Sequence, residues 1–117
     1  MKVLGYRYVT VSKDNMDMVN FFENTLGIPN SWEQSEDYQG GVFKAGDSWL
    51  EFWKTSEGMP EMTMLQVIVD DADEYAEYVK SNGVEVQGPM KEHGEKMYSL
   101  TAPNGMPVTI QSSVTMD

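Results

Sequence analysis

The chain of 117 residues contains no cysteine, a single histidine and few basic residues. Without cysteine it has no disulfide framework, no thiolate nucleophile and no cysteine metal site, which fits a cytoplasmic location. Eight basic residues stand against nineteen acidic ones, so the net charge is −11. Nucleic acid is therefore not an expected partner, because its phosphates would be repelled. No apolar run approaches the roughly 20 residues of a membrane span, so we expect no membrane association.

The overall composition is that of an ordinary globular protein. Hydrophobic residues make up 40% of the chain and charged residues 23%, which excludes an intrinsically disordered composition. The N-terminal stretch MKVLGYRYVTV is too short and too polar to be interpreted as a signal peptide. The length predicts one domain over residues 1–117.

Two segments of the chain share one plan. DNMDMVNFFENTLGI begins at Asp14 and DDADEYAEYVKSNGV begins at Asp70, an offset of 56 residues. Each segment predicts a helix, at 15–26 and 71–82, with the aspartate as N-cap. Gly27 and Gly83 follow where a left-handed C-cap is expected. The pattern indicates a duplication, with one module at about 1–56 and the other at about 62–113.

Alternating apolar residues predict strands around both helices. One strand candidate precedes each helix, and others follow it on either side of the turns at 45–47 and 102–105; they are 8–11, 42–43, 48–53, 64–69, 96–101 and 107–111. Each half therefore has a strand, a helix and then two or three strands. The glycine- and proline-containing stretch 55–63 links the halves.

This plan resembles the vicinal oxygen chelate superfamily, which includes glyoxalase I, the bleomycin resistance proteins and the extradiol dioxygenases. The similar segments are FFENTLGI at 21–28, SWLEFW at 48–53, SNGVEV at 81–86 and APNGMPVTI at 102–110. The resemblance implies an α+β fold of two tandem βαβββ modules, whose curled sheets form a cup with the helices outside. It also implies a homodimer.

Strand alternation assigns side chains to the two faces of each sheet. Apolar residues of the strands are expected on the helix side, namely Val9, Val11, Leu50, Phe52, Leu65, Val67, Val69, Val108 and Ile110. Their neighbours are expected inside the cup and are our candidate ligand-binding residues: Tyr8, Trp49, Glu51, Trp53, Met64, Gln66, Thr109 and Gln111.

The resemblance also locates the positions at which family members hold a divalent metal. They are Tyr8, Glu51, Met64 and Thr109 here, with Arg7 as the alternative to Tyr8. Glu51 alone is a usual ligand for such ions, because a thioether suits copper(I) and Thr109 is neutral. We therefore predict no metal, no cofactor and no catalytic residue. His93 lies in a polar segment and is interpreted as a surface histidine.

Trp49 and Trp53 flank Glu51 at i ± 2 and share its face of the strand. Such a group suits a cationic or aromatic organic ligand. The leading hypothesis is a metal-free small-molecule-binding protein, with the drug-sequestering bleomycin resistance proteins as its model. The alternative is a metal-dependent glyoxalase-like lyase, dioxygenase or epimerase. A third hypothesis is an interaction module whose cup is filled by its own side chains.

Overall fold

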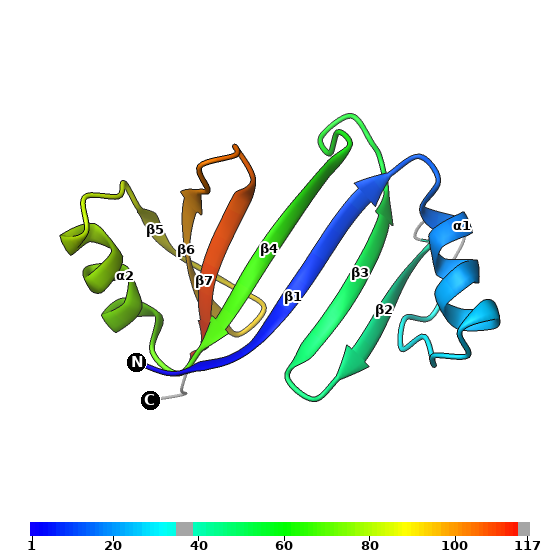
Figure 1. Cartoon of the computed structure of the whole chain (residues 1–117), viewed down its shortest axis with the longest axis horizontal. Coiled ribbons are helices and arrows are strands. Elements are labelled where there is room, and N and C mark those ends of the chain that lie inside the picture. The colour runs from blue at the N-terminus through cyan, green and yellow to red at the C-terminus, as the bar shows by residue number, and fades with distance from the viewer. Residues whose placement is uncertain (35–38, 115–117) are drawn as a thin grey trace. The chain divides into compact units, whose positions relative to one another are not determined.

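The structure, a computed structural model, describes residues 1–34 and 39–114. The predicted helices and strands are present in the predicted order, with β5 (Gln87–Glu92) in addition (Figure 1). In chain order they are β1 (Val3–Ser12), α1 (Asn15–Asn20), the π-helical segment η1 (Phe21–Thr25), β2 (Gly40–Ala45), β3 (Ser48–Lys54), β4 (Met62–Val69), α2 (Ala72–Ser81), β5 (Gln87–Glu92), β6 (Glu95–Thr101) and β7 (Pro107–Ser113). None of the helices in these ranges is long and apolar enough to cross a membrane.

The chain divides into two compact units, which we call the first and second modules. The first module is Arg7–Met64, and the second combines Met1–Tyr6 with the described residues from Leu65 onward. The N-terminal residues belong to the second module because the Lys2 carbonyl accepts from the Asp70 amide at 3.1 Å and the Asp70 carboxylate accepts from the Lys2 amide at 3.0 Å. The sequence had assigned these residues to the first half.

In the first module, β3 lies between β2, its antiparallel partner, and β1, its parallel partner. Helix α1 covers one face of this sheet, where Val19, Phe43 and Phe52 are buried together. Phe22 packs its ring 5.1 Å from the Phe52 ring and 5.7 Å from that of Phe43. A Cβ at Gly41 would lie 2.9 Å from Val19, so the close approach of the helix to β2 requires glycine there.

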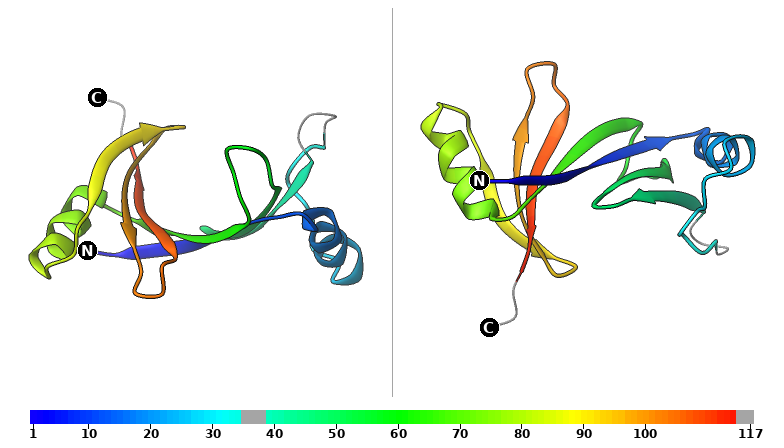
Figure 2. Two further views of the ribbon diagram at one scale, coloured as in Figure 1. Left: turned by 90° about the horizontal axis from the view of Figure 1, so that it is seen from above. Right: turned by 60° about the horizontal axis from the view of Figure 1, so that its bottom comes forward.

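In the second module, β7 runs parallel to β4 and antiparallel to β6, which is in turn antiparallel to β5. Figure 2 shows these strands side by side in the order β4, β7, β6 and β5. Helix α2 covers one face of this sheet, where the buried core consists of Val69, Ala72, Ala76, Tyr98 and Ile110. Val67 packs against this core, as strand alternation predicts.

Strand β5 was not predicted. It contains the Gly88–Pro89 pair, every residue in it is exposed, and its pairing with β6 is irregular between Gln87 and Met90. Proline and a bulge are typical of edge strands, whose outward backbone groups need no partner. Within the described residues two strands follow the helix in the first module and three follow it in the second.

The two helices occupy the predicted positions, but their N-terminal caps differ from the prediction. Asp14 is the N-cap residue of α1, although its side chain caps no backbone N–H. The N-cap of α2 is Asp71 rather than Asp70, and its carboxylate accepts from the Glu74 amide at 3.1 Å. The repeat offset at the caps is therefore 57 residues, one more than the sequence alignment indicated.

The extra residue is accommodated at the end of the first helix. Gly27 and Gly83 both have positive φ, +71° and +86°, and terminate their helices as predicted. They are 56 residues apart, whereas the caps are 57 apart, so the first helix contains one more residue. The π-helical segment Phe21–Thr25 takes it up, with the Leu26 amide bonded to the Phe21 carbonyl at 2.9 Å, because such a turn widens by one residue.

Candidate functional site

The register of the strands determines which side chains share a face. In the first module Glu51 pairs with Val9 on β1 and Val42 on β2, and Trp49 pairs with Arg7 and Lys44. Laterally paired residues project to the same side of a sheet. We call this face, which lies opposite the α1 core, the aromatic face; it consists of Arg7, Val9, Val11, Gly40, Val42, Lys44, Trp49, Glu51 and Trp53.

This register corrects the prediction for the first strand. Val9 and Val11 share the face of Glu51, whereas Tyr8 is paired with Leu50, on the side of the α1 core. The prediction assumed that the apolar residues of β1 face a helix. Val9 and Val11 are indeed buried, but on the other face of the sheet. Arg7, which the sequence left as the alternative to Tyr8, does share the face of Glu51, together with Val9 and Val11.

The predicted group of Trp49, Glu51 and Trp53 is brought together, but its contacts are internal. The Trp53 indole N–H donates to one Glu51 carboxylate oxygen at 2.9 Å, and the Trp49 N–H donates to the other in a short hydrogen bond. All three side chains are half-buried. The carboxylate is thus held between two indoles, with its orientation fixed from both sides.

The ring of Trp49 also has cationic neighbours. The Arg7 guanidinium carbon lies 3.7 Å from the ring centroid, and the Lys44 ammonium lies 5.1 Å from it. Both distances are in the range of cation–π attraction. The sequence reasoning missed Lys44, although the two-residue turn at Gly46–Asp47 would have placed it opposite Trp49.

Trp53 is packed on both sides by the first module. A Cβ on Gly40 would lie 2.4 Å from its ring, so the indole rests directly on the backbone of β2. Trp32 approaches it edge-on with centroids 4.8 Å apart. The aromatic face is therefore partly filled by its own side chains, as the third hypothesis from the sequence anticipates for the cup.

The second module presents a different face opposite its helix, which we call the polar face. One row across its strands runs from Gln87 through Ser99 and Thr109 to Gln66. Gln111, 1% exposed, lies on the same face: its amide donates to Glu95 at 3.2 Å, and its carbonyl accepts from the Thr109 hydroxyl. Gln66, Thr109 and Gln111 thus share one side of the sheet, as predicted.

The residues at the family's metal positions do not form a donor set for a divalent ion. In the first module a guanidinium shares the face of Glu51, and both oxygens of that carboxylate accept indole N–H groups. Met64 is a half-buried thioether on β4, and the Thr109 hydroxyl donates to Gln111. Among the described residues no group of three or more His, Cys, Asp or Glu side chains gathers in a way that suits a metal.

A separate polar cluster joins α2 to β6. Asp73 accepts from the Lys96 ammonium at 2.8 Å and from the Tyr98 hydroxyl in a short hydrogen bond. The bond from Lys96, followed by that from Tyr98, lowers the pKa of Asp73. The hydrogen bond to Asp73, assisted by burial, raises the pKa of Tyr98 to about 12. This cluster lies on the helix side and stabilises the fold. His93 is exposed in the turn between β5 and β6.

Comparison with known proteins agrees with this architecture. Residues 7–110 match the Glyoxalase/Bleomycin resistance protein/Dioxygenase superfamily, and no protein with a curated description matches the chain significantly. Methylmalonyl-CoA epimerase of Streptomyces coelicolor, in complex with 2-nitronate-propionyl-CoA, is similar in structure with a TM-score of 0.71 and 16% identity, over 100% of this chain and 98% of that one. A hypothetical protein of Bacillus halodurans gives 0.71 and 16%, over 99% and 96%.

A third similar structure is methylmalonyl-CoA epimerase from Mycobacterium tuberculosis, with a TM-score of 0.68 and 12% identity over 97% of this chain and 90% of that one. At these identities the likeness establishes the fold alone. The match in sequence covers most of the chain, and the chain therefore belongs to the glyoxalase, bleomycin resistance protein and dioxygenase superfamily. The α+β fold predicted from the sequence is confirmed.

Proposed function

We propose that the protein binds a small planar organic molecule at the aromatic face, without a divalent metal. The observation that carries this proposal is the arrangement around Glu51, whose two oxygens each accept an indole N–H. A carboxylate held in this way orients two large aromatic side chains. Small-molecule sites combine such apolar surfaces with a few fixed polar groups.

The charges on the aromatic face favour an aromatic ligand over a cationic one. Arg7 and Lys44 are both close to Trp49, and Glu51 is the one acidic residue of that face. A cation would meet two like charges, whereas a planar ring can stack on an indole or a guanidinium. Of the two kinds of ligand inferred from the sequence, an aromatic ligand is therefore favoured and a cationic ligand is disfavoured.

The competing function is that of a metal-dependent lyase, dioxygenase or epimerase of the same superfamily. Such an enzyme would need a divalent ion to stabilise an oxyanion or enolate. The guanidinium of Arg7, on the same face as Glu51 and over the Trp49 ring, disfavours an ion at that face, because like charges repel. Elemental analysis of the purified protein distinguishes the two functions: stoichiometric zinc, nickel, iron or manganese would overturn our proposal.

Tryptophan fluorescence provides a direct binding test, since all three tryptophans belong to the first module. Indole, benzoate and benzyltrimethylammonium serve as neutral, anionic and cationic planar probes. We expect saturable quenching, with the cation binding most weakly. Arg7→Gln should weaken benzoate roughly tenfold, the size of one charged hydrogen bond, and Lys54→Gln, at the exposed end of β3, is the matched control. Tightest binding of the cation would contradict the assignment.

Two further expectations accompany this proposal. Closed twofold pairing is the commonest form of oligomer, and we propose a homodimer. Light scattering at tens of micromolar should give twice the monomer mass, and a monomer mass at that concentration would contradict it. We also propose a cytoplasmic location, which the lack of cysteine fits; fractionation of cells of the source organism tests it, and recovery of the protein outside the cytoplasmic fraction would contradict it.

A further inference from the structure

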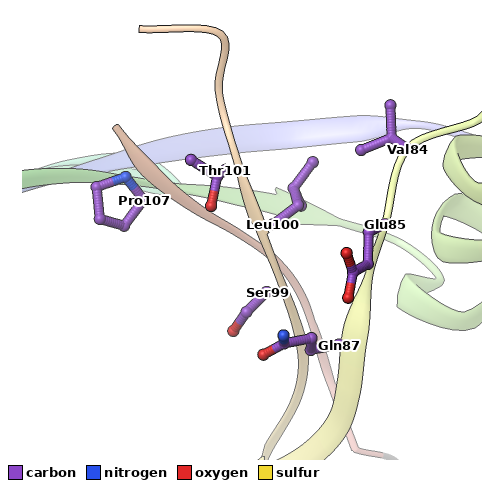
Figure 3. A pocket seen from close by; sticks show the side chains of 7 residues that line it. All are labelled: Val84, Glu85, Gln87, Ser99, Leu100, Thr101 and Pro107. Atoms are coloured by element: carbon purple, nitrogen blue, oxygen red, sulfur yellow. The ribbon is translucent and has the colours of Figure 1, made fainter. Parts of the chain in front are cut away.

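The second module contains a cavity to which Gln87 and Ser99 of the polar face contribute. Its volume is about 370 Å³, and it is lined by Val84, Glu85, Gln87, Ser99, Leu100, Thr101 and Pro107. Figure 3 shows these side chains on three neighbouring segments: the stretch that leads into β5, the end of β6 and the start of β7. The volume falls within the roughly 300–1,000 Å³ of small-molecule pockets.

The polar groups of the cavity are fixed by strand pairing. Gln87 pairs with Ser99 across β5 and β6, and Thr101 pairs with Pro107 across β6 and β7. The irregular pairing of β5 begins directly after Gln87, at Gly88, where φ is +125° and a Cβ would lie 3.0 Å from the Met97 carbonyl oxygen. This close approach, open only to glycine, lies where the pairing of β5 with β6 is interrupted, directly after the Gln87–Ser99 pair and before pairing resumes at Met90.

The chemistry of the lining excludes several ligand classes. Among the seven described residues there is one carboxylate, Glu85, and neither a cationic nor an aromatic side chain. An anion would be repelled by Glu85 and by the net charge of −11. A flat aromatic ligand would find no ring on which to stack. What remains is an amide, two hydroxyls and a carboxylate beside the apolar side chains of Val84 and Pro107. Leu100, which alternates with Ser99 and Thr101 along β6, also packs against the α2 core.

We propose that this cavity binds a hydroxyl-rich ring of the monosaccharide type. Ring hydroxyls both donate and accept, so they can pair with the Gln87 amide and the Ser99 and Thr101 hydroxyls, and donate to the Glu85 carboxylate. The C–H surface of the ring packs on the apolar residues. The site is separate from the aromatic face, since it lies in the other module and contains no tryptophan.

The test is a titration of the full-length, isotopically labelled protein followed by backbone amide chemical shifts. D-glucose, D-glucosamine, methylammonium and benzoate are the probes. We expect saturable shifts of the Gln87, Ser99 and Thr101 amides with both sugars, and none at these residues with methylammonium or benzoate. Tryptophan fluorescence should not change with the sugars, which separates this site from the aromatic face.

Two variants sharpen the result. Glu85→Gln should weaken glucose roughly three- to tenfold, because it removes a charged acceptor at an exposed position, and Gln87→Ala should weaken it as well. Glu92→Gln, the same change at the far end of β5, is the control and should leave the titration unaltered. Absence of saturable sugar shifts at the cavity, an equal response to methylammonium, or binding unchanged in both cavity variants would overturn the proposal.

Discussion

The two modules share one architecture but present opposite chemistry on the faces that their helices leave uncovered. In the first, Glu51 is held by two indoles and accompanied by Arg7 and Lys44. In the second, the position of Glu51 beside the parallel strand is taken by Thr109, in a row of neutral amides and hydroxyls. A duplicated scaffold thus conserves its core geometry while its open faces diverge.

The helices of the two modules also differ at their ends. The second helix begins at Asp71, whose carboxylate caps it, and is followed by Gly83. The first begins at Asp14, whose side chain caps no backbone N–H, and ends in a π-helical turn. The widened turn absorbs the additional residue before Gly27, so both helices end at a glycine with positive φ. Each helix still packs on its own sheet through one buried cluster.

The largest effects are expected from truncating the two cores. Phe52→Ala should lower the free energy of unfolding by about 3–5 kcal/mol and Ile110→Ala by about 2–5 kcal/mol, since both leave cavities. Urea denaturation followed by tryptophan fluorescence and by circular dichroism measures each. Tyr78→Ala, at an exposed position of α2, should stay within about 0.5 kcal/mol. A loss at Phe52 no larger than at Tyr78 would contradict the equivalence of the cores.

Next in size is the difference between the two open faces. Glu51→Leu should cost about 1–3 kcal/mol, because two half-buried indole N–H groups lose their acceptor. Thr109→Val, at the matching position of the second module, removes one hydrogen bond and should cost about 0.5–1.5 kcal/mol. Both are measured by urea denaturation, with Glu57→Gln in the exposed linker as the control. A smaller cost at Glu51 than at Thr109 would reverse the comparison.

Smaller effects on stability are expected at the N-caps of the two helices, and the two caps should differ. Asp71→Ala removes the acceptor of the Glu74 amide and should destabilise the protein by about 0.5–2 kcal/mol. Asp14→Ala removes no cap hydrogen bond and should change stability by less than about 0.5 kcal/mol. Thermal and urea unfolding of the two variants side by side provide the measurement. Equal costs would mean that Asp14 acts as a cap after all.

The smallest expected effect is the change of stability with pH that Tyr98 and Asp73 of the second module produce. The pKa of Tyr98 is raised to about 12, so its contribution to stability is present below the pKa near 10 of the unfolded chain and is lost as pH rises toward 12. The pKa of Asp73 is lowered, so its contribution is lost as pH falls below about 4.

Ultraviolet titration of tyrosinate in wild type and Tyr98→Phe isolates this group. The difference between the two should appear only as the pH approaches 12, because the buried hydroxyl keeps its proton for Asp73. Tyr75→Phe, a half-buried tyrosine of α2, is the matched control. A difference that develops fully near pH 10 would mean that the Tyr98 hydroxyl does not donate to Asp73.

Much of the fold could be predicted from the sequence because it depends on short-range sequence patterns. The glycines that end the helices, the turns at Gly46 and Gly105, and the alternation in β3 and β7 each act over a few residues, and each prediction is confirmed. Strand β5 was not predicted, because a fully exposed strand with a Gly-Pro pair shows no alternation of apolar and polar residues. The one-residue error in the repeat arose because a π-helical turn has no distinct hydrophobic period.

The candidate site was predicted in part. Alternation correctly placed Trp49, Glu51 and Trp53 on one face, because residues two apart on a strand always share a side. It misplaced Tyr8, Val9 and Val11, since which side of β1 faces the helix depends on its pairing with β3. Apolar residues occur on both faces of a central strand, so polarity alone does not decide its orientation.

The sequence by itself determined the order of the two helices and of every strand except β5, the glycines that end both helices, and the superfamily, because these depend on residue types and spacings along the chain. Only the tertiary structure decided that Arg7 rather than Tyr8 accompanies Glu51, that both oxygens of Glu51 are taken by indoles, and that Gln87, Ser99 and Thr101 line one cavity. The first of these depends on the register between β1 and β3, which are distant in sequence, and the other two on side-chain contacts and strand pairing that local pattern does not encode. A shift of one residue exchanges the two faces of a strand, so local pattern fixes the elements and long-range pairing fixes the site.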